Sequence, residues 1–243
     1  MRIALIIEYD GTNYSGWQIQ PNGKTVQEVI ENAYFTVTGE EIKLVASGRT
    51  DAGVHAVGQV AHFDTKLSQP AKSFMHILNN VLPEDIKVRD SFEVDENFHA
   101  RYSAKRKTYA YSAYIDGFDR PLSRLYSARL NKMPDIEKMQ SAKNLLIGEH
   151  DFKCFSSSNS SVKTTVRTIY DLQISIENNR LTFTVTGNGF LYNMVRIIVG
   201  ALIEVGYGRL TESEILSALS GGGRNLLGKT MPACGLTLLS VEY

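Results

Sequence analysis

The sequence predicts an α+β fold in which two similar split-βαβ (ferredoxin-like) halves form a mixed, largely antiparallel sheet, flanked by helices and with a central cleft. Short runs of alternating and β-branched residues predict strands, and longer amphipathic runs between them predict helices. The order strand, helix, strand, strand, helix, strand occurs in the first half and recurs in similar form in the second, as in a split βαβ unit. We therefore expect two domains, residues 1–102 and residues 103–243.

The first half opens with the run RIALIIEYDGT, which predicts a strand closed by the turn Asp10–Gly11. Thr25 is a typical helix N-cap residue and Glu28 follows three positions later, so a helix should begin here and end at Gly39. The remaining elements predicted for this half are strands at 41–47 and 58–65, a helix at 71–82 and a strand at 85–94.

The second half contains two long strand-like runs joined at Glu177–Arg180, which predicts a hairpin turn. The serine-rich stretch 156–161 is typical of a mobile loop. The elements predicted here are a strand at 105–115, a helix at 135–150, the hairpin within 165–190, helices at 191–206 and 211–220, and a final strand at 235–243.

Composition excludes several classes of protein. The longest apolar runs, such as 3–7 and 197–203, fall far short of the roughly 20 residues that span a bilayer, so no membrane association is predicted. The N-terminus lacks the pattern of an export signal, and we expect a cytoplasmic protein. Cys154 and Cys234 are far apart and outside any CxxC pair, so they should pack as small apolar side chains.

Charge is distributed unevenly although the net charge is zero. Residues 1–98 carry a net charge of −6, whereas residues 99–132, the basic block, carry +6 with five tyrosines among the cations. Cations suit phosphates and aromatic rings suit bases, so the block fits an RNA-binding groove. A solvated strand face with core tyrosines is the alternative. The cations of the basic block are Arg101, Lys105, Arg106, Lys107, Arg120, Arg124, Arg129 and Lys132.

Asp51 is the first candidate for a reactive side chain, in the stretch SGRTDAGVHAVGQVAHF between two predicted strands. Loops held by rigid strands often present functional side chains. Gly48 and Gly53 allow a tight turn or a close approach to a ligand, and Arg49 offers a cation that can bind a phosphate. A purely structural turn is the alternative, since Asp and Gly are common in turns.

Two further candidates lie in the second half. Arg196 follows Asn193 on a helix with little polar surface, so its charge requires a partner, and an arginine beside an aspartate would keep that carboxylate ionised and oriented. A surface arginine is the alternative. Tyr109 follows the cluster Lys105–Lys107 on a predicted strand, where it could stack on a base or pack in the core.

Other catalytic patterns are absent from the sequence or lie in the wrong context. GxSxG does not occur. The stretch GGGRNLLGKT contains the letters of the phosphate-binding pattern GxxxxGK[ST], but it lies late, before the last predicted strand rather than after a strand and opening a helix. His55 and His62 have no third ligand nearby, so no metal site is predicted. We expect no cofactor.

Eight motifs in order, over nearly the full length, resemble the tRNA pseudouridine synthase A (TruA) family. The resemblance implies that Asp51 is the essential aspartate, Arg196 its partner and Tyr109 the base-stacking tyrosine. It further implies that Arg49 helps to displace the target base and that Leu236 is the active-site leucine. The motifs are YDGTNYSGWQIQ, TVQEVIENA, SGRTDAGVHAVGQVAHF, FHARYSAKRKTYAY, GEHDFKCF, TVRTIY, GNGFLYNMVRIIVGAL and CGLTLLSVEY.

This resemblance implies isomerisation of uridine to pseudouridine in the anticodon stem-loop of tRNA, at positions 38, 39 and 40, by a homodimer that needs no cofactor. The aspartate would act as a nucleophile or as a base at the sugar. A non-catalytic protein that binds structured RNA is the alternative, but it gives no reason for an aspartate paired with an arginine. A glycoside or nucleoside hydrolase would usually need two carboxylates facing the bond, and only Asp51 is so placed.

Overall fold

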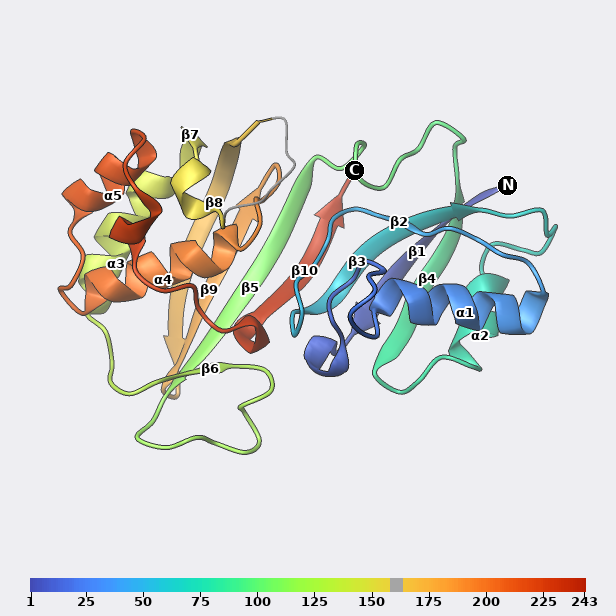
Figure 1. Ribbon diagram of the computed structural model, residues 1–243, viewed down its shortest axis with the longest axis horizontal. Helices are drawn as coiled ribbons and strands as arrows, with labels where there is room; N and C mark the ends of the chain where they lie inside the picture. Colours follow the sequence, from blue (N-terminus) through green and yellow to red (C-terminus); the bar gives the residue numbers. More distant parts are fainter. Residues whose placement is uncertain (158–163) are drawn as a thin grey trace. The chain divides into compact units, whose positions relative to one another are not determined.

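The structure, a computed structural model, describes residues 1–157 and 164–243, so most of the serine-rich loop predicted at 156–161 lies outside the described residues (Figure 1). The chain forms two compact units. Unit 1 comprises Met1–Lys105 together with Thr237–Tyr243, and unit 2 comprises Arg106–Leu236.

The predicted fold class is confirmed. The described residues form five α-helices and ten strands, and most strand pairs are antiparallel. Parallel pairing of β3 with β10 and of β5 with β6 makes the pattern mixed. The central cleft stays a prediction. No helix among the described residues is long and apolar enough to cross a bilayer.

Unit 1 carries its strands in the order β4, β1, β3, and β3 pairs in addition with β2 and β10. This is the strand order of a split βαβ unit, with the first strand beside the third and fourth and the third beside the second. Its elements are β1 (Arg2–Tyr9), the 3-10 turn η1 (Gly11–Asn13), α1 (Val26–Thr38), β2 (Val45–Ala46), β3 (His55–Asp64), α2 (Ser73–Asn79), β4 (Ile86–Val94) and most of β10 (Leu236–Glu242).

The core of unit 1 follows from strand alternation and helix capping. Ile3, Leu5 and Ile7 on β1 alternate along the strand, share one face and are fully buried. Helix α1 has the predicted bounds: the Thr25 side chain accepts a hydrogen bond from the Glu28 amide, and Gly39 ends the helix in the left-handed conformation. Three rings pack between helices and sheet with centroids 5.2 to 6.2 Å apart: Tyr34, Phe63 and Phe74.

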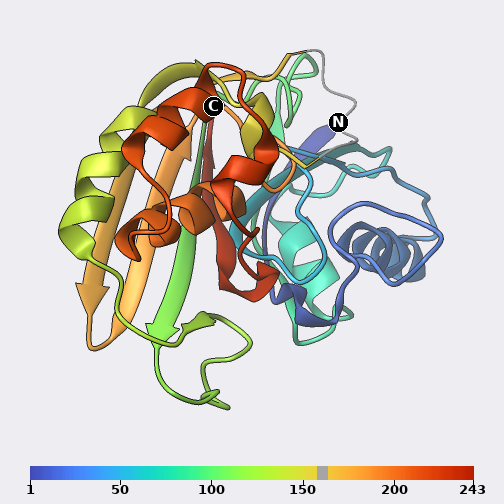
Figure 2. The same ribbon diagram turned by 60° about the vertical axis from the view of Figure 1, so that its left-hand side comes forward.

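Unit 2 repeats this pairing, because β5 pairs with β9 and β9 with β8, as β1 pairs with β3 and β3 with β2. Figure 2 shows α3, α4 and α5 together on one side of these strands. The elements are β5 (Arg106–Ile115), β6 (Ala128–Leu130), α3 (Ile136–Ala142), η2 (Lys143–Leu146), β7 (Gly148–Asp151), η3 (Lys153–Phe155), β8 (Val166–Glu177), β9 (Arg180–Gly187), α4 (Met194–Gly206), α5 (Glu212–Leu219), η4 (Arg224–Leu227) and η5 (Ala233–Gly235).

Two predicted elements of this half differ from the structure. The helix predicted at 135–150 ends at Ala142, and residues 148–151 form β7 because they pair with β8. The final strand, β10, falls in the second of the two domains expected from the sequence, residues 103–243. In the structure almost all of it belongs to unit 1, where Thr237 and Leu238 pair with β3. The predicted hairpin turn at Glu177–Arg180 is confirmed. Its two central residues, Asn178 and Asn179, both have positive φ, as a type I′ turn requires.

A carboxylate in unit 1 ties the end of α1 to the end of β3. Glu40 accepts hydrogen bonds from the Tyr34 hydroxyl at 2.9 Å, the Thr65 hydroxyl at 2.5 Å and the Lys66 amide at 2.9 Å. The Thr65 hydrogen bond is the largest cause that lowers the pKa of Glu40 below its ordinary value. The folded state therefore gains stability above the unfolded pKa of about 4.3 and loses it as the pH falls through the lower folded value.

Replacing Glu40 by Gln should lower the free energy of unfolding at pH 7 by about 1 to 2 kcal/mol, because the three donors lose a charged acceptor. The deficit should shrink in urea titrations below about pH 4. Glu41→Gln is the control: its side chain is exposed, so the change should stay within about 0.5 kcal/mol. Equal stability of Glu40→Gln and wild type at pH 7 would contradict this role.

Candidate active site

Asp51 lies in the predicted place, a turn between β2 and β3, where it is half-buried while Arg49 is exposed. The turn is attached to the sheet of unit 1 on both sides. The Thr50 hydroxyl lies 2.7 Å from the Tyr9 hydroxyl of β1, and the side-chain Nε2 of Gln59 on β3 donates to the Gly48 carbonyl at 2.9 Å. These contacts hold the backbone that leads into Asp51 against strands β1 and β3.

The segment after β1 packs directly on this turn. The Trp17 amide donates to the Thr50 carbonyl at 3.1 Å, and the Gly53 amide donates to the Tyr14 carbonyl at 3.3 Å. Gly16 has a φ of +92°, and a Cβ at this position would lie 2.5 Å from the Thr50 carbonyl oxygen. Only glycine meets both requirements. The motif YDGTNYSGW therefore supports the turn that carries Asp51.

The histidines near the turn have structural roles. His55 is 4% exposed, and its Nδ1 accepts a hydrogen bond from the Gly11 amide at 3.0 Å. His62 accepts one from the Ala100 amide at 3.1 Å. Among residues 1–157 and 164–243, no group of three or more His, Cys, Asp or Glu side chains could hold a metal ion.

In unit 2, Tyr109 lies on β5 and is 7% exposed, with its ring 5.2 Å from that of Phe190 at an angle of 84°. Tyr111, two residues further along, shares its face of the strand and is fully buried. Its hydroxyl donates to the Pro232 carbonyl at 2.9 Å, and burial raises its pKa. Strand β5 thus presents a pair of rings to the helix-covered side of unit 2.

Arg196 is the third residue of α4, and neighbours within unit 2 orient its guanidinium. Its Nε donates to the Met231 carbonyl at 2.7 Å, and one Nη donates to the Asn193 side-chain oxygen at 2.6 Å. Asn193 caps the helix at positive φ and donates to the Ser157 hydroxyl at 2.8 Å. Arg196 is half-buried and its guanidinium makes two hydrogen bonds, unlike the surface arginine considered as the alternative from the sequence.

Leu236 ends residues 231–236, a segment that we call the strap. Met231 holds Arg196, and Pro232 accepts the hydrogen bond from Tyr111. A Cβ at Gly235 would lie 2.5 Å from the Tyr111 ring, so the strap lies flat on β5 only with glycine there. Leu236 is 6% exposed. The strap therefore connects Arg196, the β5 rings and Leu236.

The structure groups the predicted site residues by unit. Asp51 and Arg49 share one turn of unit 1, and the strap joins Arg196 and Leu236 over the strand that carries Tyr109 in unit 2. Sequence reasoning missed the roles of Gly16 and Tyr111, although both lie within the motifs YDGTNYSGWQIQ and FHARYSAKRKTYAY. Their roles depend on partners distant in sequence.

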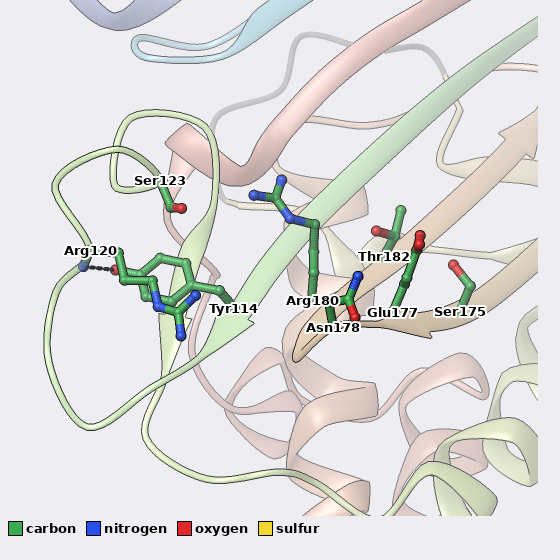
Figure 3. Close-up of a pocket in the computed structure, with 8 residues that line it drawn as sticks. All are labelled: Tyr114, Arg120, Ser123, Ser175, Glu177, Asn178, Arg180 and Thr182. Atoms are coloured by element: carbon green, nitrogen blue, oxygen red, sulfur yellow. Dashed lines mark hydrogen bonds between the residues drawn. The ribbon is translucent and has the colours of Figure 1, made fainter.

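A pocket of unit 2 lies elsewhere, under the loop that follows β5 (Figure 3). It has a volume of about 380 Å³ and includes Tyr114, which lies five residues beyond Tyr109 and hence about 17 Å further along β5. None of the predicted site residues lines it, so it is not the candidate active site. Its lining residues are Tyr114, Arg120, Ser123, Ser175, Glu177, Asn178, Arg180 and Thr182.

Comparisons with known proteins give a consistent result. The profile of the family described as tRNA pseudouridine synthase matches residues 5–103 and 142–243. tRNA pseudouridine synthase A of Acetivibrio thermocellus is 49% identical over 99% of both chains. That of Ruminiclostridium cellulolyticum is 49% identical over 100% of this chain and 99% of its own. The structure titled "Crystal Structure of a Cbf5-Nop10-Gar1 Complex" aligns over 99% of this chain and 58% of that chain at 15% identity, with a TM-score of 0.38 that is too low to support an argument.

The fold, the turn with its single aspartate and these matches define an isomerase, a pseudouridine synthase. The chain belongs to the tRNA pseudouridine synthase A family. The resemblance seen in the eight sequence motifs is thereby confirmed.

Gly16→Ala should displace the Asp51 turn, because the new methyl group meets the Thr50 carbonyl and the backbone is strained. We expect a loss of about 2 to 4 kcal/mol in the free energy of unfolding and a fall in kcat of the folded fraction. Denaturant titration and single-turnover assays measure the two effects.

Gly39→Ala is the matched control, since Gly39 also has a positive φ, +70°, but no atom lies within 4 Å of its Cβ position. It should cost only about 1 to 2 kcal/mol of backbone strain and leave kcat unchanged. If both variants behaved alike in stability and rate, packing of Gly16 on the turn would not position Asp51.

Proposed function

We propose that this protein isomerises uridine to pseudouridine in the anticodon stem-loop of tRNAs, at positions 38, 39 and 40, with Asp51 as the reacting carboxylate. The observation that carries the proposal is the turn of Asp51, held to β1 and β3 and packed against Gly16, in a member of this enzyme family. Because the turn is held in this way, the carboxylate is presented before the substrate arrives, which lowers the entropic cost of the reaction.

The proposed reaction is an isomerisation that requires no second substrate. The bond between ribose C1′ and uracil N1 breaks, the uracil turns, and C1′ bonds to C5, whose proton passes to solvent while N1 regains one. No electrons are exchanged and no group is added. A free aspartate is ionised at neutral pH and can attack C1′ or remove a sugar proton. Both routes account for a site with one carboxylate.

The other site residues have supporting roles in this proposal. Arg196 holds the ionised Asp51 in orientation, and the contacts of its guanidinium with Met231 and Asn193 support a positioning role. Tyr109 receives the base, and its low exposure supports a dry site in which water does not intercept the opened sugar. Leu236 closes the apolar side of this site, as its burial suggests.

The substrate must give up base stacking before it can react. Turning a nucleotide out of a stem costs a few kcal/mol, which contacts with the protein must offset. The exposed Arg49 fills the vacated space, and the basic block supplies contacts to phosphates. We further propose a cytoplasmic homodimer in which one tRNA contacts both subunits.

Asp51→Asn should bind tRNA nearly normally and form no pseudouridine, because the amide keeps the shape of the side chain and loses the negative charge. Release of tritium from uridine labelled at C5 measures the reaction, and filter binding measures affinity. Glu41→Gln changes an exposed carboxylate of unit 1 and should keep full turnover. Normal tritium release by Asp51→Asn would refute the assignment.

Replacing Lys105 and Arg106 by alanine should weaken tRNA binding and reduce the slope of log Kd against log salt by about 1 to 2, since two phosphate contacts are lost. Lys43 and Lys66 are exposed cations in the acidic first part of the chain, and their double replacement serves as the control. A slope that is unchanged in the first variant would place the RNA away from the basic block.

A further inference from the structure

A short turn at the end of unit 1, residues 99–103, is held far more firmly than its surface position requires. The Ser103 amide donates to the His99 carbonyl at 2.8 Å, and the His99 amide donates to the Ser103 hydroxyl at 3.1 Å. The Tyr243 hydroxyl donates to the Ala100 carbonyl at 2.9 Å, which ties the turn to the C-terminus. These three hydrogen bonds hold the backbone of the turn.

Two histidines complete the support. Nδ1 of His62 accepts the Ala100 amide at 3.1 Å, and Nδ1 of His99 accepts the amides of Arg101 at 3.1 Å and Tyr102 at 3.3 Å. Each Nδ1 must therefore keep its lone pair, so a neutral ring carries its proton on Nε2. The His62 and His99 rings lie 5.1 Å apart at 63°. Burial is the largest cause that lowers the pKa of His62, which favours this neutral form.

The supported turn presents an aromatic ring to solvent. Tyr102 is 77% exposed, although its ring lies 4.3 Å from that of His99 at an angle of 34°. Tyrosine is seldom exposed to this extent, and here the side chain rests on a rigid base. Because the Tyr102 side chain is already supported by His99, it should lose less conformational entropy on binding a ligand than a flexible surface side chain would lose.

A cation lies over this ring, and a second follows it closely in the sequence. The Arg101 guanidinium lies 5.7 Å from the ring centroid of Tyr102, and the exposed Lys105 follows three residues later. The sequence has no acidic residue from position 97 to position 115. A ligand that meets this surface should therefore combine a flat π-face with a negative charge, which describes a nucleotide.

We propose that His99, Arg101 and Tyr102 form a stacking platform for one unpaired nucleotide of the RNA substrate, outside the site that holds the reacting uridine. The base stacks on the exposed ring of Tyr102, and its phosphate is bound by Arg101 and Lys105. This inference rests on the proposed function for the identity of the RNA. The platform determines affinity and placement of the tRNA and takes no part in bond making.

Tyr102→Ala tests the platform with unmodified tRNA transcript as the probe. Kd and KM should rise by about 5- to 150-fold, the value of one base stacked on an aromatic ring, while kcat at saturating tRNA stays unchanged. Phe35→Ala removes another exposed ring of unit 1, on α1, and should change neither constant. Because Tyr102 is largely exposed, its truncation should leave the thermal unfolding midpoint unchanged.

Tyr102→Trp provides a direct readout. The indole should retain affinity, and its fluorescence should be quenched as tRNA binds, beyond the change that the wild type shows from its single native tryptophan, Trp17, whose amide contacts the Asp51 turn. Unquenched fluorescence at saturating tRNA would overturn the platform, as would wild-type affinity of Tyr102→Ala. A shift of Tyr102→Ala to a smaller species in sedimentation velocity would assign the ring to a protein interface, which also overturns it.

The same experiments separate this inference from the proposed function. If the wild type forms no pseudouridine but Tyr102→Ala still weakens RNA binding and Tyr102→Trp is quenched, the platform stands and the proposed reaction fails. If the wild type is active and both Tyr102 variants report no contact, the reaction stands and the platform fails.

Discussion

Contact between two stretches of backbone, at Gly16 and at the Thr50 carbonyl, is the constraint on which the candidate site depends. A side chain at position 16 would push away the turn that holds Asp51, and the hydrogen bonds from Trp17 and Gln59 would then lose their geometry. Carboxylates are common on protein surfaces and seldom react. What distinguishes this one is that its backbone is attached to two strands and covered by a third segment, so the turn that presents the carboxylate is ordered before any RNA arrives.

Unit 2 uses the same physical device. There the strap lies flat on β5 because Gly235 has no side chain, and the Tyr111 hydroxyl and the Arg196 guanidinium hold its backbone. In both units an irregular segment is therefore held by the strands beneath it, so that side chains on a loop keep fixed positions. The turn 99–103 follows this rule with histidines in place of a strand. The Asp51 turn, the strap and the turn 99–103 are therefore each held by hydrogen bonds within the protein.

The sequence predicted correctly those helices whose ends are set by residues within or next to the helix itself. The capping residues Thr25 and Gly39 define α1, and Thr211 with Glu214 forms the capping box of α5. Strand β7 and the strap depend on partners far away in sequence, so residues 148–150 were predicted as a helix end and residues 231–234 had no predicted structure. Asp51 was found because its turn has an unusual composition. The support from Gly16 could not be seen, since only the folded chain brings positions 16 and 50 together.

The central claim is that a pinned aspartate rearranges a uridine and leaves the RNA chain whole. Purified protein incubated with unmodified tRNA transcript, followed by carbodiimide treatment and primer extension, tests it most directly. New carbodiimide-dependent stops that report positions 38, 39 or 40 are expected, with no uracil in solution. Free uracil with abasic sites, or a transcript that gains no stop in the anticodon stem-loop, would contradict the claim.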